Sequence, residues 1–188
     1  MIENTFEEFP VLETERLILR AINLADCHAL LEVFSSEEVM KWYGMYPLAE
    51  MESVVQIIEN FRTSFAQKKS IRWAIELKVT GDVIGTCGFH NHNQTARRAE
   101  IGYELNERYW GRGYIKEAIK AMMNFGGDTL NLRRIEALVY PENKASQSAL
   151  ESLGFEEEGL LRDYAYFRNV YQDLIMYSWI NENHIRND

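Results

Sequence analysis

The fold of this chain is decided by the stretch Arg108-Tyr109-Trp110-Gly111-Arg112-Gly113-Tyr114. The residues before it, 99–105, read as a strand, and apolar residues after it recur at the spacing of one helical face. A glycine-bearing turn therefore joins the end of a strand to the start of a helix. Glycine lets backbone N–H groups converge, and a helix N-terminus adds partial positive charge. The stretch predicts an anion site that suits phosphate above all.

The rest of the chain alternates between strand-like and amphipathic segments around this turn. Thr80-Gly81-Asp82 is typical of a hairpin turn, and the polar residues 92–95 are typical of another turn. Gly126-Gly127 is typical of the end of a helix. The periodicity predicts strands at 12–22, 72–77, 83–89, 99–105, 134–140, 155–161 and 170–180, and helices at 25–34, 51–65, 114–125 and 143–153.

The resulting order is β-α-α-β-β-β-α-β-α-β-β, which indicates a mixed α/β (α+β) domain around one sheet. It lacks the strict alternation of a Rossmann fold. We expect one domain at 10–181, with an N-terminal extension at 1–9 and a C-terminal tail at 182–188.

Composition limits the partners of this protein. The formal net charge of −9 argues against nucleic-acid binding and suits a cationic partner such as an amine or a basic protein. No apolar run is long enough for a membrane span, and the acidic N-terminus does not resemble a signal peptide, so a cytoplasmic location is expected. The two distant cysteines, Cys27 and Cys87, are expected to be reduced and packed.

Four motifs in this order resemble one known family. The pattern Arg-x-x-Gly-x-Gly begins at Arg108, the strand Glu100-Ile101-Gly102-Tyr103 precedes it, and Asn143-x-x-Ser146 and Leu153-Gly154-Phe155 follow. Together they resemble the GCN5-related N-acetyltransferase (GNAT) family, which uses acetyl-CoA. The opening residues 12–20 and Tyr109-Trp110-Gly111 are similar to the branch that acetylates the N-termini of ribosomal proteins.

This resemblance implies a mostly antiparallel central sheet flanked by helices, with acetyl-CoA as co-substrate and no metal. The strand before the glycine turn would splay from its neighbour, and the pantetheine arm would pair with backbone groups at residues 103–105. Arg108, Arg112 and Lys116 would supply local cations. The expected acetyl-CoA contacts are Tyr103, Leu105, Arg108, Gly111, Arg112, Gly113, Tyr114, Ile115, Asn143 and Ser146.

The same resemblance suggests the catalytic groups. Many relatives carry a tyrosine acid one turn before Leu-Gly-Phe, where this chain has Leu150, so Ser146 is expected to donate a hydrogen bond to the departing sulfur. Asn143 can also serve simply as a helix N-cap. Glu100 and Glu104 are both candidates for the general base, since a bulge in this strand would change which side chains share a face.

Two further groups carry weaker signals. His90 and His92 share one face of a strand end, but too few other histidines or cysteines lie near them in sequence to complete a tetrahedral zinc set, so we expect no metal and interpret them as a polar wall for the acceptor. Tyr164, Tyr166 and Tyr171 can line that site too, or simply pack.

The sequence thus predicts an enzyme that transfers an acetyl group directly to a primary amine, without a covalent acetyl-enzyme. A protein N-terminus, such as that of a ribosomal protein, is the preferred acceptor. A small amine (polyamine or antibiotic) is the alternative, and a non-catalytic acyl-CoA sensor is the rival from another class. The sequence does not decide between a monomer and a homodimer.

Overall fold

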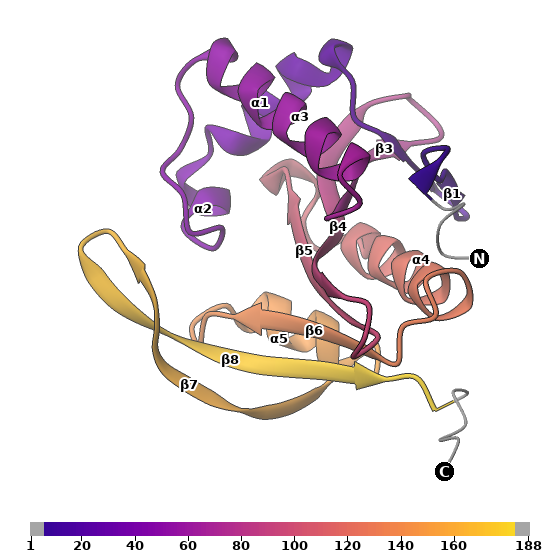
Figure 1. Cartoon of the computed structure of the whole chain (residues 1–188). Helices are drawn as coiled ribbons and strands as arrows, with labels where there is room; N and C mark the ends of the chain where they lie inside the picture. The colour runs from indigo at the N-terminus through magenta and orange to yellow at the C-terminus, as the bar shows by residue number, and fades with distance from the viewer. Residues whose placement is uncertain (1–5, 183–188) are drawn as a thin grey trace.

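One eight-stranded sheet organises the chain in the computed structural model, which describes residues 6–182 (Figure 1). The strand order is β1-β2-β3-β4-β5-β6-β8-β7. Every neighbouring pair is antiparallel except β5 and β6, which run parallel. The predicted mixed fold with a mostly antiparallel sheet is confirmed.

The elements follow the predicted order closely. The strands are β1 (Leu12–Glu13), β2 (Leu17–Ala21), β3 (Ile71–Leu77), β4 (Val83–Asn93), β5 (Arg98–Leu105), β6 (Arg134–Val139), β7 (Glu156–Phe167) and β8 (Val170–Ile180). The helices are α1 (Cys27–Phe34), α2 (Glu37–Met40), α3 (Met51–Ala66), α4 (Tyr114–Asp128) and α5 (Lys144–Glu151). Single 3-10 turns occupy Leu24–Asp26 and Glu107–Tyr109.

Several elements differ from the prediction. The first expected strand is broken at residues 14–16, and the short α2 has no counterpart in the prediction. β4 continues to Asn93 through the residues expected to turn. Gly126 and Gly127 lie inside α4 rather than ending it. A Cβ atom at Gly126 would be 3.0 Å from Phe89 Cζ. The small residue permits close packing of helix on sheet.

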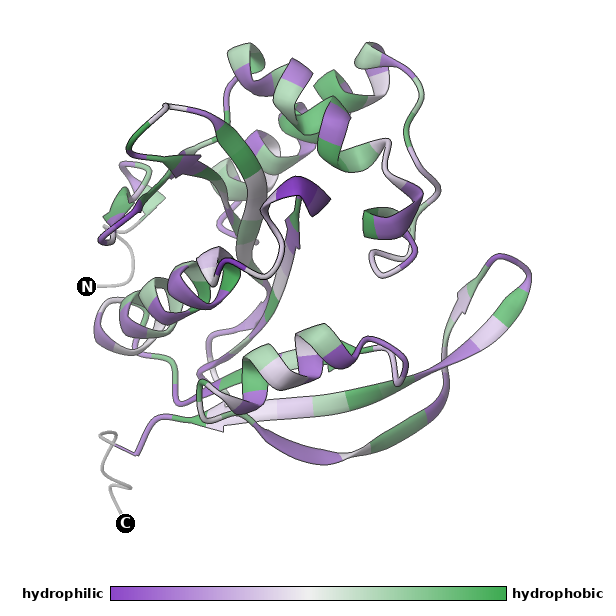
Figure 2. Ribbon diagram, turned by 180° about the vertical axis from the view of Figure 1, so that it is seen from behind, coloured by the Kyte–Doolittle hydropathy of each residue, from purple (hydrophilic) through white to green (hydrophobic). Residues whose placement is uncertain are grey.

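Helices cover both faces of the sheet and create two apolar cores. On one face α1, α2 and α3 enclose a cluster that includes Phe34, Val54 and Ile58. On the other face α4 packs over Trp73, whose ring centroid is 5.6 Å from that of Phe125. Figure 2 shows apolar and hydrophilic residues alternating around α3 and α4, as expected for helices with one buried stripe.

The N-terminal residues described by the structure also join this second core. Phe6 and Phe9 pack against Phe65, with ring centroids 5.4 and 4.7 Å away. The Trp73 indole donates a hydrogen bond to the Pro10 carbonyl at 2.8 Å. Residues 1–5 of the expected extension and 183–188 of the expected tail lie outside the described residues.

β5 and β6 separate soon after they meet, which shapes the centre of the molecule (Figure 1). In the described chain they pair only where Arg98–Glu100 face Arg134–Glu136. β5 then stays with β4 to Leu105, while β6 stays with β8 to Val139. One edge of residues 101–105 therefore has no strand partner in the described part of the chain.

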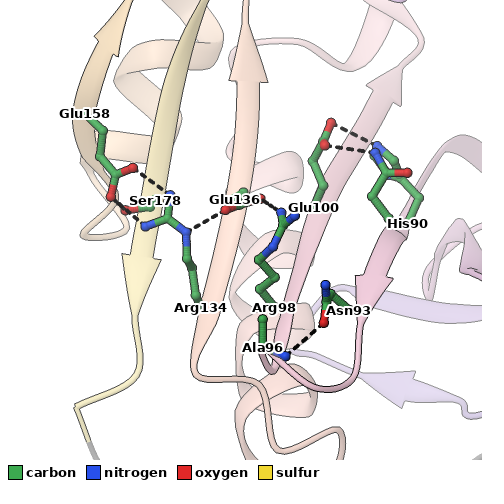
Figure 3. A network of polar contacts seen from close by, with 10 residues as sticks. His90, Asn93, Ala96, Arg98, Glu100, Arg134, Glu136, Glu158 and Ser178 are labelled. Atoms are coloured by element: carbon green, nitrogen blue, oxygen red, sulfur yellow. Dashed lines mark hydrogen bonds and ion pairs between the residues drawn. The ribbon is translucent and has the colours of Figure 1, made fainter.

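A ladder of charges crosses the strands where they are still paired (Figure 3). Glu136 is buried and accepts hydrogen bonds from Arg98 at 2.5 Å and from Arg134 at 2.6 Å. Arg134 also makes a bidentate pair with Glu158, at 2.6 Å for both bonds. The hydrogen bonds from Arg134 and Ser178 lower the pKa of Glu158 to about 2. This charge ladder ties β5, β6 and β7 together at the closed end of the gap.

Candidate functional site

The glycine turn lies at the open end of the gap, between β5 and α4. Gly111 and Gly113 have φ of 73° and 79°, the left-handed region that a side chain disfavours. Gly113 is the residue that precedes α4 and has no capping side chain. The positive φ values, rather than crowding, require glycine here, because a Cβ at Gly111 would meet nothing within 4 Å.

This conformation leaves a row of backbone donors exposed. The N–H groups of residues 111–113 donate to no other group in the described chain. The N–H groups of residues 114–116 belong to the first turn of α4 and have no helical partner. The row and the positive helix end together have the geometry that an anion site needs, and anion binding at this turn stays a prediction.

The turn is braced from the N-terminal end of the chain. Arg16 donates to the Arg112 carbonyl at 3.0 Å and to Glu117 of α4 at 2.6 Å. Glu117 also accepts from the Thr14 hydroxyl at 2.6 Å and from the Arg16 N–H at 2.8 Å. Burial acts to raise the pKa of Glu117, but these hydrogen bonds outweigh it and lower that pKa. Thr14 and Arg16, in the break between β1 and β2, therefore tie the glycine turn and the first turn of α4 to the start of the sheet.

The three cations expected at the turn occupy different positions. Lys116 lines the cavity beside the turn, together with Gly111 and Gly113. Arg108 is exposed and lies 3.3 Å from Glu32, which offsets its charge. The Arg112 guanidinium lies 5.6 Å from the Tyr109 ring centroid.

Two cavities meet where β5 and β6 have separated. The first, of about 370 Å³, lies beside the glycine turn and also contacts α5. The second, of about 460 Å³, is walled by the aromatic residues Phe61, Phe89 and Tyr140 and by the polar residues His90 and Glu100. Residues common to both linings are Trp42, Tyr43, Tyr103, Asn143 and Ser146. These shared residues mark the junction, which we call the cavity junction.

A hydrogen bond spans the cavity junction. The Tyr103 hydroxyl of β5 lies 2.6 Å from the Ser146 hydroxyl of α5. Burial is the larger influence on Tyr103 and raises the pKa of its phenol to about 12. The structure thus brings a residue expected only for its backbone into side-chain contact with Ser146.

Helix α5 presents Ser146 through an N-cap. The Asn143 side chain accepts a hydrogen bond from the Ser146 N–H at 3.1 Å, the capping geometry that the sequence predicted for it. Asn143 also lines both cavities. Leu150 is fully buried in the core, so it contributes no polar group to either cavity.

The two candidate bases have different surroundings although they share one face of β5. Glu104 is 5% exposed and pairs with the buried Arg72. It also accepts a hydrogen bond from Thr86, and Arg72 donates to the Gly102 carbonyl at 3.0 Å. No bulge interrupts β5 over residues 100–105, where its register with β4 is continuous.

Glu100 instead lies on the wall of the second cavity. One of its oxygens is 3.0 Å from His90 Nε2 (Figure 3), and the other accepts from Asn91 at 3.0 Å. Burial acts to raise the pKa of Glu100, but these contacts outweigh it and lower the pKa. Glu100 is therefore ionised at neutral pH.

Several residues expected near the site lie elsewhere. Tyr164, Tyr166 and Tyr171 lie on the β7–β8 hairpin and are 55%, 62% and 64% exposed. None of them lines either cavity, and neither does His92. Within residues 6–182, no group of three or more histidine, cysteine, aspartate or glutamate residues could hold a metal ion. Cys27 and Cys87 are buried and free, as expected.

Other residues of the site carried no signal in the sequence. Arg72 and Thr86 become relevant only because β3, β4 and β5 are neighbours in the sheet. Trp42 and Tyr140 meet across the gap with ring centroids 6.0 Å apart, although about 100 residues separate them. Such contacts depend on topology, which a local pattern does not contain.

Comparison with known proteins gives a consistent result. The family described as "Acetyltransferase (GNAT) domain" matches residues 16–156. The uncharacterized N-acetyltransferase YoaA of Bacillus subtilis (strain 168) is 41% identical over 170 residues, which cover 90% of this chain and 96% of YoaA. The ribosomal protein uS5-alanine N-acetyltransferase of Escherichia coli (strain K12) is 25% identical over 174 residues, 88% of each chain.

Solved structures share the fold. RimL, a ribosomal L7/L12 alpha-N-protein acetyltransferase in complex with coenzyme A, superposes with a TM-score of 0.81 over 91% of this chain and 98% of its own. The two sequences are 20% identical, so this likeness speaks for the fold alone.

The buried pair Glu104–Arg72 leads to a prediction about stability. Glu104→Gln leaves the Arg72 guanidinium buried without its counter-charge, so we expect the free energy of unfolding to fall by about 3–5 kcal/mol. Adding Arg72→Met removes the stranded charge and is expected to restore more than half of the loss. Urea denaturation of both variants measures this. A loss below about 1 kcal/mol in the single variant would contradict the assignment.

Proposed function

The chain belongs to the GNAT family of acetyltransferases, and from that premise we propose that it transfers the acetyl group of acetyl-CoA directly to the α-amine of a protein N-terminus. The observation that carries the proposal is the meeting of two cavities at Ser146, one beside an anion-binding turn and one walled by aromatic side chains and a carboxylate. This arrangement supports a donor and an acceptor bound together.

The residues beside the first cavity fit the donor. The free N–H row at 111–116 suits a diphosphate, with Lys116 as the nearest cation. The unpaired edge of residues 101–105 suits an arm that carries amide groups. The side chains and backbone that would hold acetyl-CoA are those of Tyr103, Leu105, Arg108, Gly111, Arg112, Gly113, Tyr114, Ile115, Asn143 and Ser146.

The chemistry needs three contributions from the chain: a donor to the acetyl oxygen, a donor to the departing sulfur, and a base for the amine proton. A backbone N–H on the free edge of β5 donates to the acetyl oxygen as negative charge develops there. The amine nitrogen forms a bond to the acetyl carbon, and the bond from that carbon to sulfur breaks. Ser146 donates a hydrogen bond to the departing sulfur. A thiol has a pKa of about 8.5, so the sulfur can leave as a thiolate anion without a strong acid.

Glu100 is the better of the two candidate bases. Glu104 is committed to Arg72 and Thr86, and taking a proton would break a buried ion pair. Glu100 faces the acceptor cavity and can take the amine proton directly or through water. Its lowered pKa makes it a weak base, however.

A weak base favours an α-amine over a lysine side chain. An α-amine with a pKa of about 8 is roughly 10% neutral at pH 7, whereas a lysine with a pKa of about 10.4 is roughly 0.04% neutral. The neutral fraction of the α-amine is thus about 250-fold larger, and a lysine acceptor would need a strong base to make up this difference. The similarity to the ribosomal protein uS5-alanine N-acetyltransferase of Escherichia coli and the acidic charge of this chain also support a protein N-terminus as acceptor.

The acceptor is tested with matched peptides. We expect acetyl-CoA and a basic decapeptide with a free N-terminus to give acetylated peptide and free thiol at pH 7. The same peptide with a blocked N-terminus and one internal lysine should give a kcat/KM at least about 100-fold lower, because its amine is almost fully protonated. Mass spectrometry and thiol release measure both.

Each rival has its own outcome in this assay. Preferential acetylation of spermidine or an aminoglycoside would replace the protein acceptor with a small amine. Tight binding of acetyl-CoA without turnover of any amine would favour a non-catalytic sensor.

The role of Glu100 leads to a pH-dependent prediction. Glu100→Gln is expected to lower kcat/KM for the free-N-terminus peptide about tenfold at pH 7, where most of the amine needs deprotonation. At pH 9 the α-amine is mostly neutral, so the loss should shrink to less than about threefold. Glu156→Gln, at an exposed position on β7, is the matched control. An equal loss at both pH values would exclude Glu100 as the base.

A further inference from the structure

The Tyr103–Ser146 hydrogen bond is a bridge rather than part of a packed wall. β5 and β6 make no backbone pair at Tyr103 in the described chain, and Ser146 lies on the helix that follows β6. The two hydroxyls, 2.6 Å apart, are therefore the polar contact that crosses the gap at this level. Both residues line both cavities, so the bridge lies where donor and acceptor meet.

We propose that Tyr103 is a positioning residue that turns the Ser146 hydroxyl toward the departing sulfur, so that stabilisation of the leaving thiolate depends on the pair. The inference rests on the proposed function, because it needs a thioester at the cavity junction. It adds a side-chain role for a residue that was expected to contribute only its backbone.

The hydrogen-bonding capacity of the two groups carries the argument. A serine hydroxyl has one proton to donate and can accept from two donors. If Ser146 donates to Tyr103, no proton faces the sulfur. If Tyr103 donates to Ser146, the Ser146 proton is free to bond the sulfur. The Ser146 N–H is already used by the Asn143 cap, so it does not supply a second donor.

Tyr103 can stay the donor at every working pH. Burial raises the pKa of its phenol to about 12, so the hydroxyl keeps its proton near neutrality. For the same reason it does not give that proton away. A thiolate whose thiol has a pKa of about 8.5 is a much weaker base than tyrosinate, so proton transfer from Tyr103 to the thiolate is unfavourable.

The proton balance follows from this. The attacking amine loses its proton to Glu100 or water, and the bond from carbon to sulfur breaks to give a thiolate. The thiolate leaves as an anion held by the Ser146 hydrogen bond and takes a proton from solvent afterwards. Tyr103 and Ser146 end the cycle with their own protons.

The first test needs no acceptor. Coenzyme A is bound to the protein, and the pKa of its thiol is measured from thiolate absorbance in the ultraviolet. A hydrogen bond to the charged form lowers a pKa, so Ser146→Ala should raise the bound thiol pKa by about one unit. Tyr103→Phe, which keeps the ring and removes only the hydroxyl, should raise it nearly as much.

The control is a second tyrosine whose hydroxyl bonds to the same helix, α5. The Tyr177 side chain of β8 is buried, its hydroxyl donates to Glu151 of α5 at 3.1 Å, and it lines neither cavity. Tyr177→Phe should therefore leave the thiol pKa within about 0.2 units of wild type, which controls for the loss of a hydroxyl bonded to α5.

A double-mutant cycle on turnover completes the test. Tyr103→Phe is expected to lower kcat about tenfold with KM for acetyl-CoA changed less than twofold, and to add less than twofold when Ser146 is already alanine. Additive losses of kcat in the double variant would overturn this inference and leave the proposed function standing. So would a bound thiol pKa that Ser146→Ala raises and Tyr103→Phe leaves at the wild-type value. Failure of the wild-type protein to bind coenzyme A would overturn the proposed function, and this inference with it.

Discussion

The parting of β5 and β6 is the constraint on which the rest of this molecule depends. Within residues 6–182, these two parallel strands pair only where Arg98–Glu100 face Arg134–Glu136, and each then continues beside its antiparallel neighbour. The buried Glu136, held by two arginines, fixes the point of separation. Beyond that point the sheet offers a free backbone edge, which is costly to leave unpaired and so suits a ligand that pairs with it.

Every part of the candidate site is positioned around the gap between β5 and β6. The glycine turn lies where β5 ends, and Arg16 braces it from the opposite end of the chain. α5 follows β6, so its first turn faces back across the gap. The Tyr103–Ser146 bridge then joins the two sides at the level where the cavities meet. An acidic protein can thereby hold an anionic donor, because backbone dipoles supply much of the positive potential.

Local chemistry was readable from the sequence, and long-range contacts were not. The turn at Gly111 and Gly113 and the cap at Asn143 were predicted because glycine conformation and capping act within a few residues. The commitment of Glu104 to Arg72 was missed, because the two residues meet through the sheet, 32 positions apart. Strand alternation alone placed Glu100 and Glu104 on the same face of β5. It could not show that Glu100 lines a cavity whereas Glu104 belongs to a buried ion pair.

In the proposed complex, the free edge of β5 receives the donor molecule. Amide hydrogen exchange of the full chain, with and without saturating coenzyme A, tests it most directly. We expect strong protection at residues 101–105 and 111–116 on binding, and little change in the edge strand β7, which β6 and β8 separate from β5. Tight binding with unchanged exchange at residues 101–105 would contradict it.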